Sequence, residues 1–356
     1  MMQKKIADID AAVLADFRLG CVIPAQPLAL DEQRRLSPRY QRALCRYYID
    51  AGAGGIAVGV HSTQFEIRNP KIGLFEPLLE QCSDFVDDWS AHRGRKILKV
   101  AGVCGLTGQA LSEAGFALQA GYDACLLSLA AFKQASVADM LQHCRELAQI
   151  MPIIGFYLQP SVGGAWLPYQ FWREFVEIDN VLGIKIAPFN RYATFDVLRA
   201  VAESGADISL YTGNDDNILL DLLSVYEIAG RRLRIKGGLL GHWCCWTRKA
   251  VELLQEVQAL SPDTNEQIPA ELLSRNLQIT DCNAAFFDPA NNFAGCIPGI
   301  HEVLFRQGLL PSRHCLDPDE KLSPGQAEEI SRVQAAYPHL NDDQFVKDNL
   351  ELWLSH

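Results

Sequence analysis

The chain has 356 residues, of which 49% are hydrophobic and 21% charged, a composition typical of a globular protein with a large core. Its 32 basic and 43 acidic side chains give a formal charge of −11 at pH 7. Such a chain has no general attraction to nucleic acid phosphates or anionic lipids, so we expect neither nucleic acid nor a membrane as a partner. No uncharged apolar stretch reaches the roughly 18 residues of a membrane span, and we expect a cytoplasmic protein.

Short apolar segments bounded by glycine or proline alternate with amphipathic segments of helical length, the pattern of a parallel sheet with connecting helices. The later segments begin about 25 to 30 residues apart, which is the length that a strand, a helix and two loops require. The spacing predicts a (β/α)8 TIM barrel, with a doubly wound sheet as the alternative. The eight predicted strands are Gly20–Pro24, Gly55–Val60, Ile97–Val103, Ala124–Leu129, Ile153–Leu158, Leu182–Ile186, Ile208–Thr212 and Leu233–Ile235.

After the predicted barrel, which takes residues 1–258, the chain changes character. The polar segment 261–269 reads as a connector, and residues 259–356 form a helical C-terminal extension, with helices over 270–310 and 324–354. Appended helices of this kind usually cover the flank of a barrel or build a subunit contact. The eleven cysteines are odd in number and none are spaced as CxxC, so we expect reduced thiols packed in the core.

Lys185 is the most informative residue for function. It lies between Ile184 and Ile186 in a strand that should be buried on both faces, where an ammonium group is costly to desolvate. Burial would lower the pKa of this amine and leave neutral nucleophile at pH 7, able to form a Schiff base with a carbonyl substrate. The alternative interpretation is a structural salt bridge to a neighbouring strand.

Tyr157 ends the preceding strand, and Pro160 opens the loop that follows. Adjacent strand ends of a barrel face each other, so we expect the phenol to lie near Lys185 and to move protons to and from the substrate oxygen. The alternative is a barrel tyrosine whose hydroxyl donates to a backbone carbonyl.

FYLQP, followed one strand later by GIKIAPF, resembles the dihydrodipicolinate synthase and N-acetylneuraminate lyase family of class I, lysine-dependent aldolases. The resemblance runs from about Asp16 to Val257 and implies that Tyr157 and Lys185 work together. It also implies that a loop of small hydroxyl residues after the second strand binds the carboxylate of a 2-oxo acid. In HSTQFE these residues are Ser62 and Thr63, with His61 before them; ordinary loop or cap residues are the alternative.

Two further segments resemble loops of that family or offer ligand contacts. YTGNDD resembles its S-G-D-D turn and implies that Asn214 and Asp215 line the mouth of the pocket. IKGGLLGHW follows as a glycine-rich segment in which Gly238 would permit close approach of a ligand to the backbone, and His242 adds an imidazole. A tight turn without a ligand explains the glycines equally well.

Two departures argue against dihydrodipicolinate synthase itself. That enzyme carries an arginine for the carboxylate of its second substrate where this chain has Val162, and a tyrosine pair where this chain has Ala131 and Phe132. We therefore expect a related lyase or aldolase that acts on pyruvate or another 2-oxo acid and makes or breaks a carbon–carbon bond, or removes water. No metal or organic cofactor is required, and we expect a homo-oligomer, a dimer or a tetramer.

Two other classes of function stay open at this stage. A metal-dependent lyase or hydrolase could use His61, His242, Asp215 and Asp216 as ligands from strand ends. A barrel without catalytic activity could instead bind a ligand, or a partner through its helical extension.

Overall fold

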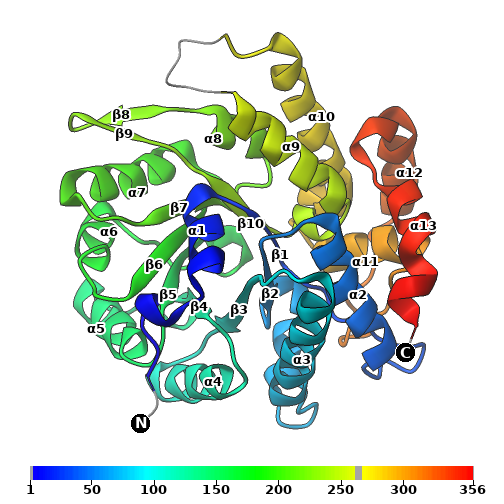
Figure 1. Cartoon of the computed structure of the whole chain (residues 1–356), viewed down its shortest axis with the longest axis horizontal. Helices are drawn as coiled ribbons and strands as arrows, with labels where there is room; N and C mark the ends of the chain where they lie inside the picture. Colours follow the sequence, from blue (N-terminus) through cyan, green and yellow to red (C-terminus); the bar gives the residue numbers. More distant parts are fainter. Residues whose placement is uncertain (1–2, 261–266, 356) are drawn as a thin grey trace.

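The computed structural model describes residues 3–260 and 267–355 and forms an eight-stranded parallel barrel with a helical extension (Figure 1). The hydrogen-bonded strand order is β1-β10-β7-β6-β5-β4-β3-β2, and a parallel bridge between Ala25 and Ala57 joins the first two strands. The predicted TIM barrel is confirmed. Its strands are β1 (Val22–Pro24), β2 (Gly55–Val58), β3 (Leu98–Val103), β4 (Ala124–Ser128), β5 (Ile153–Leu158), β6 (Val181–Ala187), β7 (Ser209–Thr212) and β10 (Gly237–Leu240).

Helices cover the outside of the sheet. Alternate strand residues such as Ile23, Val100 and Leu126 point into the barrel, and the others pack outward against the helices in a second buried cluster. The helices of the barrel are α1 (Ala11–Leu19), α2 (Pro38–Ala51), α3 (Phe75–Arg93), α4 (Thr107–Gln119), α5 (Val137–Ala148), α6 (Tyr169–Phe175), α7 (Arg191–Ser204), α8 (Ile218–Leu223) and α9 (Thr247–Ala259).

The eighth strand of the barrel lies later in the chain than predicted. Leu233 belongs to β9 (Arg231–Leu233), which pairs with β8 (Tyr226–Ile228) in an antiparallel hairpin apart from the barrel sheet. The barrel strand is β10, whose Gly237 passes so close to β1 and β7 that a Cβ atom would lie 2.5 Å from the Cys21 carbonyl oxygen. The prediction was wrong because the strand is glycine-rich and lacks the β-branched residues that mark a strand in a sequence.

The extension consists of α10 (Ala270–Phe287), α11 (Cys296–Arg306), α12 (Gln326–Ala336) and α13 (Asp343–Leu354), which lie together beside α2 and α9 (Figure 1). Trp353 of α13 donates a hydrogen bond to Asp50 of α2, 2.8 Å away, so this helix covers the flank. The predicted connector falls largely on residues 261–266, outside the described residues. None of the helices in the described ranges is long and apolar enough to cross a membrane.

Candidate active site

Lys185 lies in β6, two residues before its carboxyl end, and points into the barrel. It pairs in register with Phe156 of β5, and its Nζ atom lies 4.3 Å from the centre of the Phe156 ring. Only 9% of the residue is exposed, and within the described residues its amine has no hydrogen-bond partner. Burial lowers the pKa of Lys185 below that of a free lysine, and the charge of Asp215 opposes this shift.

Gly213, which follows β7, makes room for the lysine. A Cβ atom at Gly213 would lie 2.6 Å from Cε of Lys185 and 2.8 Å from Cβ of Ala187. Such distances are shorter than van der Waals contact, so only glycine leaves the lysine stem in place. Gly213 is a site residue beyond those predicted from the sequence, although it directly precedes Asn214 in the turn that resembles the family.

The pocket around Lys185 has a volume of about 80 Å³ and opens at the carboxyl ends of the strands. Its polar lining residues are His61, Ser62, Gln159, Lys185 and Asp215. Residues of the extension complete the wall, a contribution beyond those predicted from the sequence. They are Phe287 at the end of α10, Phe293 in the loop that follows, and Cys296 and Ile300 of α11.

Asp215 and His61 are the two titratable groups of this pocket that interact with the charge of Lys185. Burial raises the pKa of the Asp215 carboxyl, while the positive charge of Lys185 and the backbone N–H of His242, 3.2 Å from Oδ1, lower it. Burial and then the charge of Lys185 lower the pKa of His61 to about 4, so its imidazole is neutral at pH 7. The pocket therefore holds an amine, a carboxyl group that resists ionisation and an uncharged imidazole.

The chain matches the Dihydrodipicolinate synthetase family over residues 18–227, more than half its length. The chain belongs to this family. A stretch of 120 residues is 29% identical to 4-hydroxy-tetrahydrodipicolinate synthase from Methanosarcina barkeri, covering 33% of this chain and 40% of that enzyme. The chain spans about half the length of the curated relatives it matches.

Solved structures of the dihydrodipicolinate synthetase family share the fold. The prophage protein YagE from E. coli K12, solved with pyruvate, has a TM-score of 0.71 at 16% identity, over 90% of this chain and 97% of that one. N-acetylneuraminate lyase from Fusobacterium nucleatum has a TM-score of 0.69 at 16% identity, over 90% and 98% of the two chains. At these identities the likeness concerns the fold alone.

Tyr157, the residue of the Y-x-x-P turn, does not face Lys185. It pairs in register with Ile186, so it points to the outer side of the sheet, where its ring lies 5.3 Å from that of Trp172 in α6. Burial raises the pKa of Tyr157 to about 12. The expectation that the two side chains meet is wrong, because successive residues of a strand point to opposite faces and Phe156 takes the inner position.

The two hydroxyl residues after β2 have different places. Ser62 lines the pocket, and its Oγ donates to the carbonyl oxygen of Ala25, 2.6 Å away. Thr63 is fully buried outside the pocket lining: its Oγ1 accepts the backbone N–H groups of Gly59 and Val60 and donates to the Gln26 carbonyl at 2.7 Å. Thr63 therefore ties this loop to the end of β1, which corrects its assignment as a carboxylate ligand.

Asn214 does not line the pocket either. Its Oδ1 accepts the backbone N–H of Phe189 at 3.0 Å, and its Nδ2 donates to Asp221 at 3.0 Å. Both ends of this amide are thus occupied by the protein. Asn214 therefore positions Phe189, which does line the pocket. The expectation that Asn214 itself lines the pocket is corrected to this indirect role.

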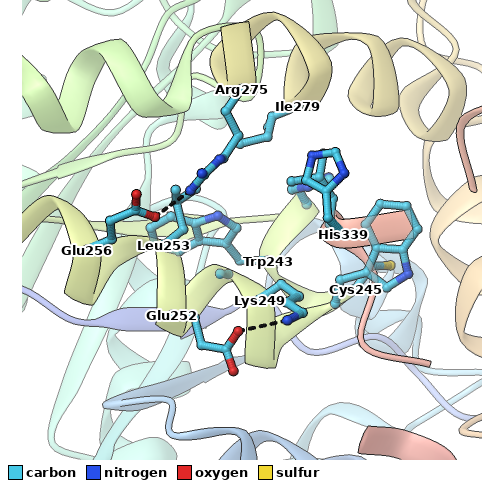
Figure 2. Close-up of a pocket in the computed structure, with 13 residues that line it drawn as sticks. Trp243, Cys245, Lys249, Glu252, Leu253, Glu256, Arg275, Ile279 and His339 are labelled. Atoms are coloured by element: carbon cyan, nitrogen blue, oxygen red, sulfur yellow. Dashed lines mark hydrogen bonds and ion pairs between the residues drawn. The ribbon is translucent and has the colours of Figure 1, made fainter. Parts of the chain in front are cut away.

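Gly238 and His242 lie apart from the Lys185 pocket. Gly238 is inside β10 and faces outward, where a Cβ atom would lie 2.6 Å from the Trp243 ring, so Trp243 occupies the space beside this glycine where a ligand was expected. His242 lines a second pocket of about 230 Å³, which Figure 2 shows crossed by the ion pairs Lys249–Glu252 and Glu256–Arg275. The imidazole is stacked on Phe286, with 5.4 Å between ring centres.

The proposed metal ligands are divided between the two pockets. His61 and Asp215 line the pocket of Lys185, whereas His242 lines the other. In residues 3–260 and 267–355, no group of three or more histidine, cysteine, aspartate or glutamate side chains is placed to hold a metal ion. The arrangement lends no support to a metal site built from these residues.

Proposed function

We propose that this member of the family is a class I lyase in which Lys185 forms an imine with the ketone of pyruvate or another 2-oxo acid. The observation that supports it is the amine itself, which is buried at the carboxyl end of a barrel strand without a hydrogen-bond partner in the described chain. A structural lysine would be paired, because an unpaired buried ammonium group is costly. A nucleophilic lysine must instead be neutral and free to attack.

The imine would act as an electron sink. The amine of Lys185 attacks the ketone carbon and water leaves, which gives a protonated imine. Electrons from the bond at the adjacent carbon flow into the imine when that bond breaks, and the resulting enamine can form the bond in reverse. Protonation of the enamine carbon gives the imine again, and its hydrolysis then restores the amine and releases the 2-oxo acid.

We assign proton transfer to Asp215 rather than to Tyr157. Asp215 lines the same pocket as Lys185, and burial raises the pKa of its carboxyl toward neutrality, where an acid can both donate and accept. The Tyr157 hydroxyl lies on the other side of the sheet. A carboxyl group of raised pKa can therefore serve the addition of the amine and the loss of water.

Gln159 is the polar side chain of the pocket wall that we assign to the substrate carboxylate. The Oε1 atom of Gln159 accepts a hydrogen bond from Ser161 at 2.6 Å, which leaves the amide N–H groups as donors on the pocket wall. Ser62 Oγ donates its proton to Ala25, so in this arrangement it offers only an acceptor, and a carboxylate, which itself only accepts, gains no hydrogen bond from it. The positive charge on the protonated imine would supply the main attraction for the carboxylate.

Borohydride reduction tests this proposal. Incubation with pyruvate and borohydride should attach a stable adduct to the peptide that contains Lys185, detected as a mass increase. Lys185→Ala should lose the adduct, whereas Lys99→Ala, which removes the buried lysine of β3, should keep it. If a panel of 2-oxo acids leaves no adduct on Lys185, the class I mechanism is wrong.

A further inference from the structure

The wall of the Lys185 pocket beyond its polar groups is mostly apolar and includes four phenylalanines. No lysine or arginine other than Lys185 lines this pocket in the described part of the chain, and His61 is uncharged at pH 7. A second negatively charged group on a substrate would therefore meet no cation there. The apolar lining residues include Val60, Phe156, Leu158, Val162, Phe189, Phe287, Phe293 and Ile300.

Two of these aromatic residues, Phe189 and Phe293, adopt a backbone conformation that is costly for an aromatic side chain. Their φ angles are +52° and +64°, in the left-handed region that non-glycine residues rarely occupy. Their rings lie 6.2 Å apart at 74°, an edge-to-face contact. Strain of this kind is found mainly at functional sites. Two strained residues with rings in contact at one pocket therefore indicate that this part of the wall serves the function of the pocket.

Each strained residue is held by specific hydrogen bonds. Phe189 donates its backbone N–H to Asn214, and Phe293 donates its own to the carbonyl oxygen of Asp288 at 3.0 Å. The buried Asp288 carboxylate also accepts from Ser323 Oγ at 2.5 Å and from Asn291 Nδ2 at 2.6 Å. The loop between α10 and α11 therefore presents Phe293 to the pocket in a defined position.

We propose that the carbon–carbon bond step joins pyruvate to, or releases from its adduct, an uncharged apolar aldehyde of the aromatic class. This inference rests on the imine chemistry proposed above and names its second reactant. In the condensing direction the pyruvate imine loses a methyl proton to give an enamine, whose carbon bonds to the aldehyde carbon. The aldehyde oxygen takes up a proton, and water hydrolyses the imine to release a 4-hydroxy-2-oxo acid and the free amine.

The charges in the pocket also disfavour an aldehyde that carries a carboxylate. Val162 cannot donate a hydrogen bond to such a group, and the Asp215 carboxyl would repel it when ionised. An aromatic ring, in contrast, would replace water at Phe189 and Phe293 and gain both apolar burial and edge-to-face contact.

The test compares two aldehydes with pyruvate as the common partner: benzaldehyde, and succinate semialdehyde, which carries a carboxylate. We expect kcat/KM for benzaldehyde to exceed that for succinate semialdehyde by at least about tenfold. Borohydride trapping with pyruvate alone is run on the same sample. A trapped imine together with a preference for the charged aldehyde, or with condensation of neither, overturns this inference alone. Absence of the imine overturns it together with the proposed function.

Variants are compared by the ratio of kcat/KM for benzaldehyde to kcat/KM for succinate semialdehyde. This ratio does not depend on the fraction of folded protein. Phe293→Ala should lower the ratio about tenfold by removing an aromatic wall. Val162→Arg should lower it further by supplying a cation for the carboxylate. Tyr192→Ala, which removes a surface aromatic residue of α7 that is 87% exposed, is the matched control and should leave the ratio unchanged. A ratio unaffected by both pocket variants would contradict the assignment.

Discussion

Lys99 and Lys185 are both buried lysines in barrel strands, each between two aliphatic residues, yet their surroundings differ. Lys99 is the second residue of β3 and lies on the outer side of the sheet, where its Nζ donates to Ser83 at 2.9 Å and to Asp87 of α3 at 2.7 Å. Lys185 lies toward the carboxyl end of β6 and on the inner side, with no such partner in the described residues.

The difference shows how a barrel separates stability from chemistry. Lysine at the amino end of a strand, on the helix-facing side, can neutralise its charge against a helix. At the carboxyl end, inside the barrel, a lysine faces the pocket built by the loops, which is where barrel enzymes place their reactive groups. The same residue type is thus a structural contact in one place and a candidate nucleophile in the other.

We expect the largest effect from replacing Lys185 with methionine, and the same replacement of Lys99 is the comparison. Lys185→Met should lower turnover by at least about 10⁴-fold, because it removes the nucleophile. It should also raise the free energy of unfolding at pH 7 by about 1–3 kcal/mol, since burial lowers the pKa of Lys185 and the folded chain must hold an amine that prefers water. This gain should vanish above the pKa of an unfolded lysine, about 10.4, where the amine is neutral in both states.

Lys99→Met should behave in the opposite way. Turnover should stay near that of the wild type, while the free energy of unfolding falls by about 1 kcal/mol through the lost hydrogen bonds to Ser83 and Asp87. For both variants, steady-state kinetics measures turnover and urea unfolding measures the free energy of unfolding. A loss of turnover in Lys99→Met without unfolding would remove the distinction between the two lysines.

Asp215→Asn should reduce turnover by about 10²–10⁴-fold, the range for loss of a general acid or base. It should also move the pH dependence of imine formation. The Asp215 charge raises the pKa of Lys185 against the effect of burial, so removal of this charge lowers that pKa further. The midpoint of the pH dependence of imine formation therefore shifts to lower pH. Borohydride trapping rates across a pH series give the midpoint, and a shift to higher pH would contradict the pairing.

Gly213→Ala should lower kcat/KM by about 100-fold, because the added methyl group would displace the stem of Lys185 by contact with Cε. Gly115→Ala is the matched control: in α4 no atom lies within 4 Å of the added Cβ, and activity should not change. Equal activities of the two variants would mean that the lysine stem adapts without loss.

Tyr157→Phe should have the smallest effect, less than about threefold on turnover. Its hydroxyl lies on the outer side of the sheet beside Trp172, so its loss leaves the Lys185 pocket intact. A decrease of 100-fold or more, the size expected for a general acid or base, would show that the phenol reaches the substrate after all.

Several features could be predicted from the sequence because local patterns specify them. Apolar segments at regular spacing indicated the barrel, and a lysine between two isoleucines indicated the strand of the candidate nucleophile. The resemblance of FYLQP and GIKIAPF agreed with the family match. These patterns can be recognised in a sequence because alternation along a strand and the length of a strand–helix unit depend on neighbouring residues alone.

Other features depend on contacts between distant residues. Whether Phe156 or Tyr157 faces the pocket follows from the register between strands, and a shift of one residue would exchange them. The hairpin of β8 and β9 and the glycine-rich β10 are decided by which segment fits beside β1. Phe287, Phe293 and Ile300 reach Lys185 only because the extension folds back over the mouth of the barrel. Side-chain alternation is a local property, whereas the face that becomes the inside is set when the sheet closes.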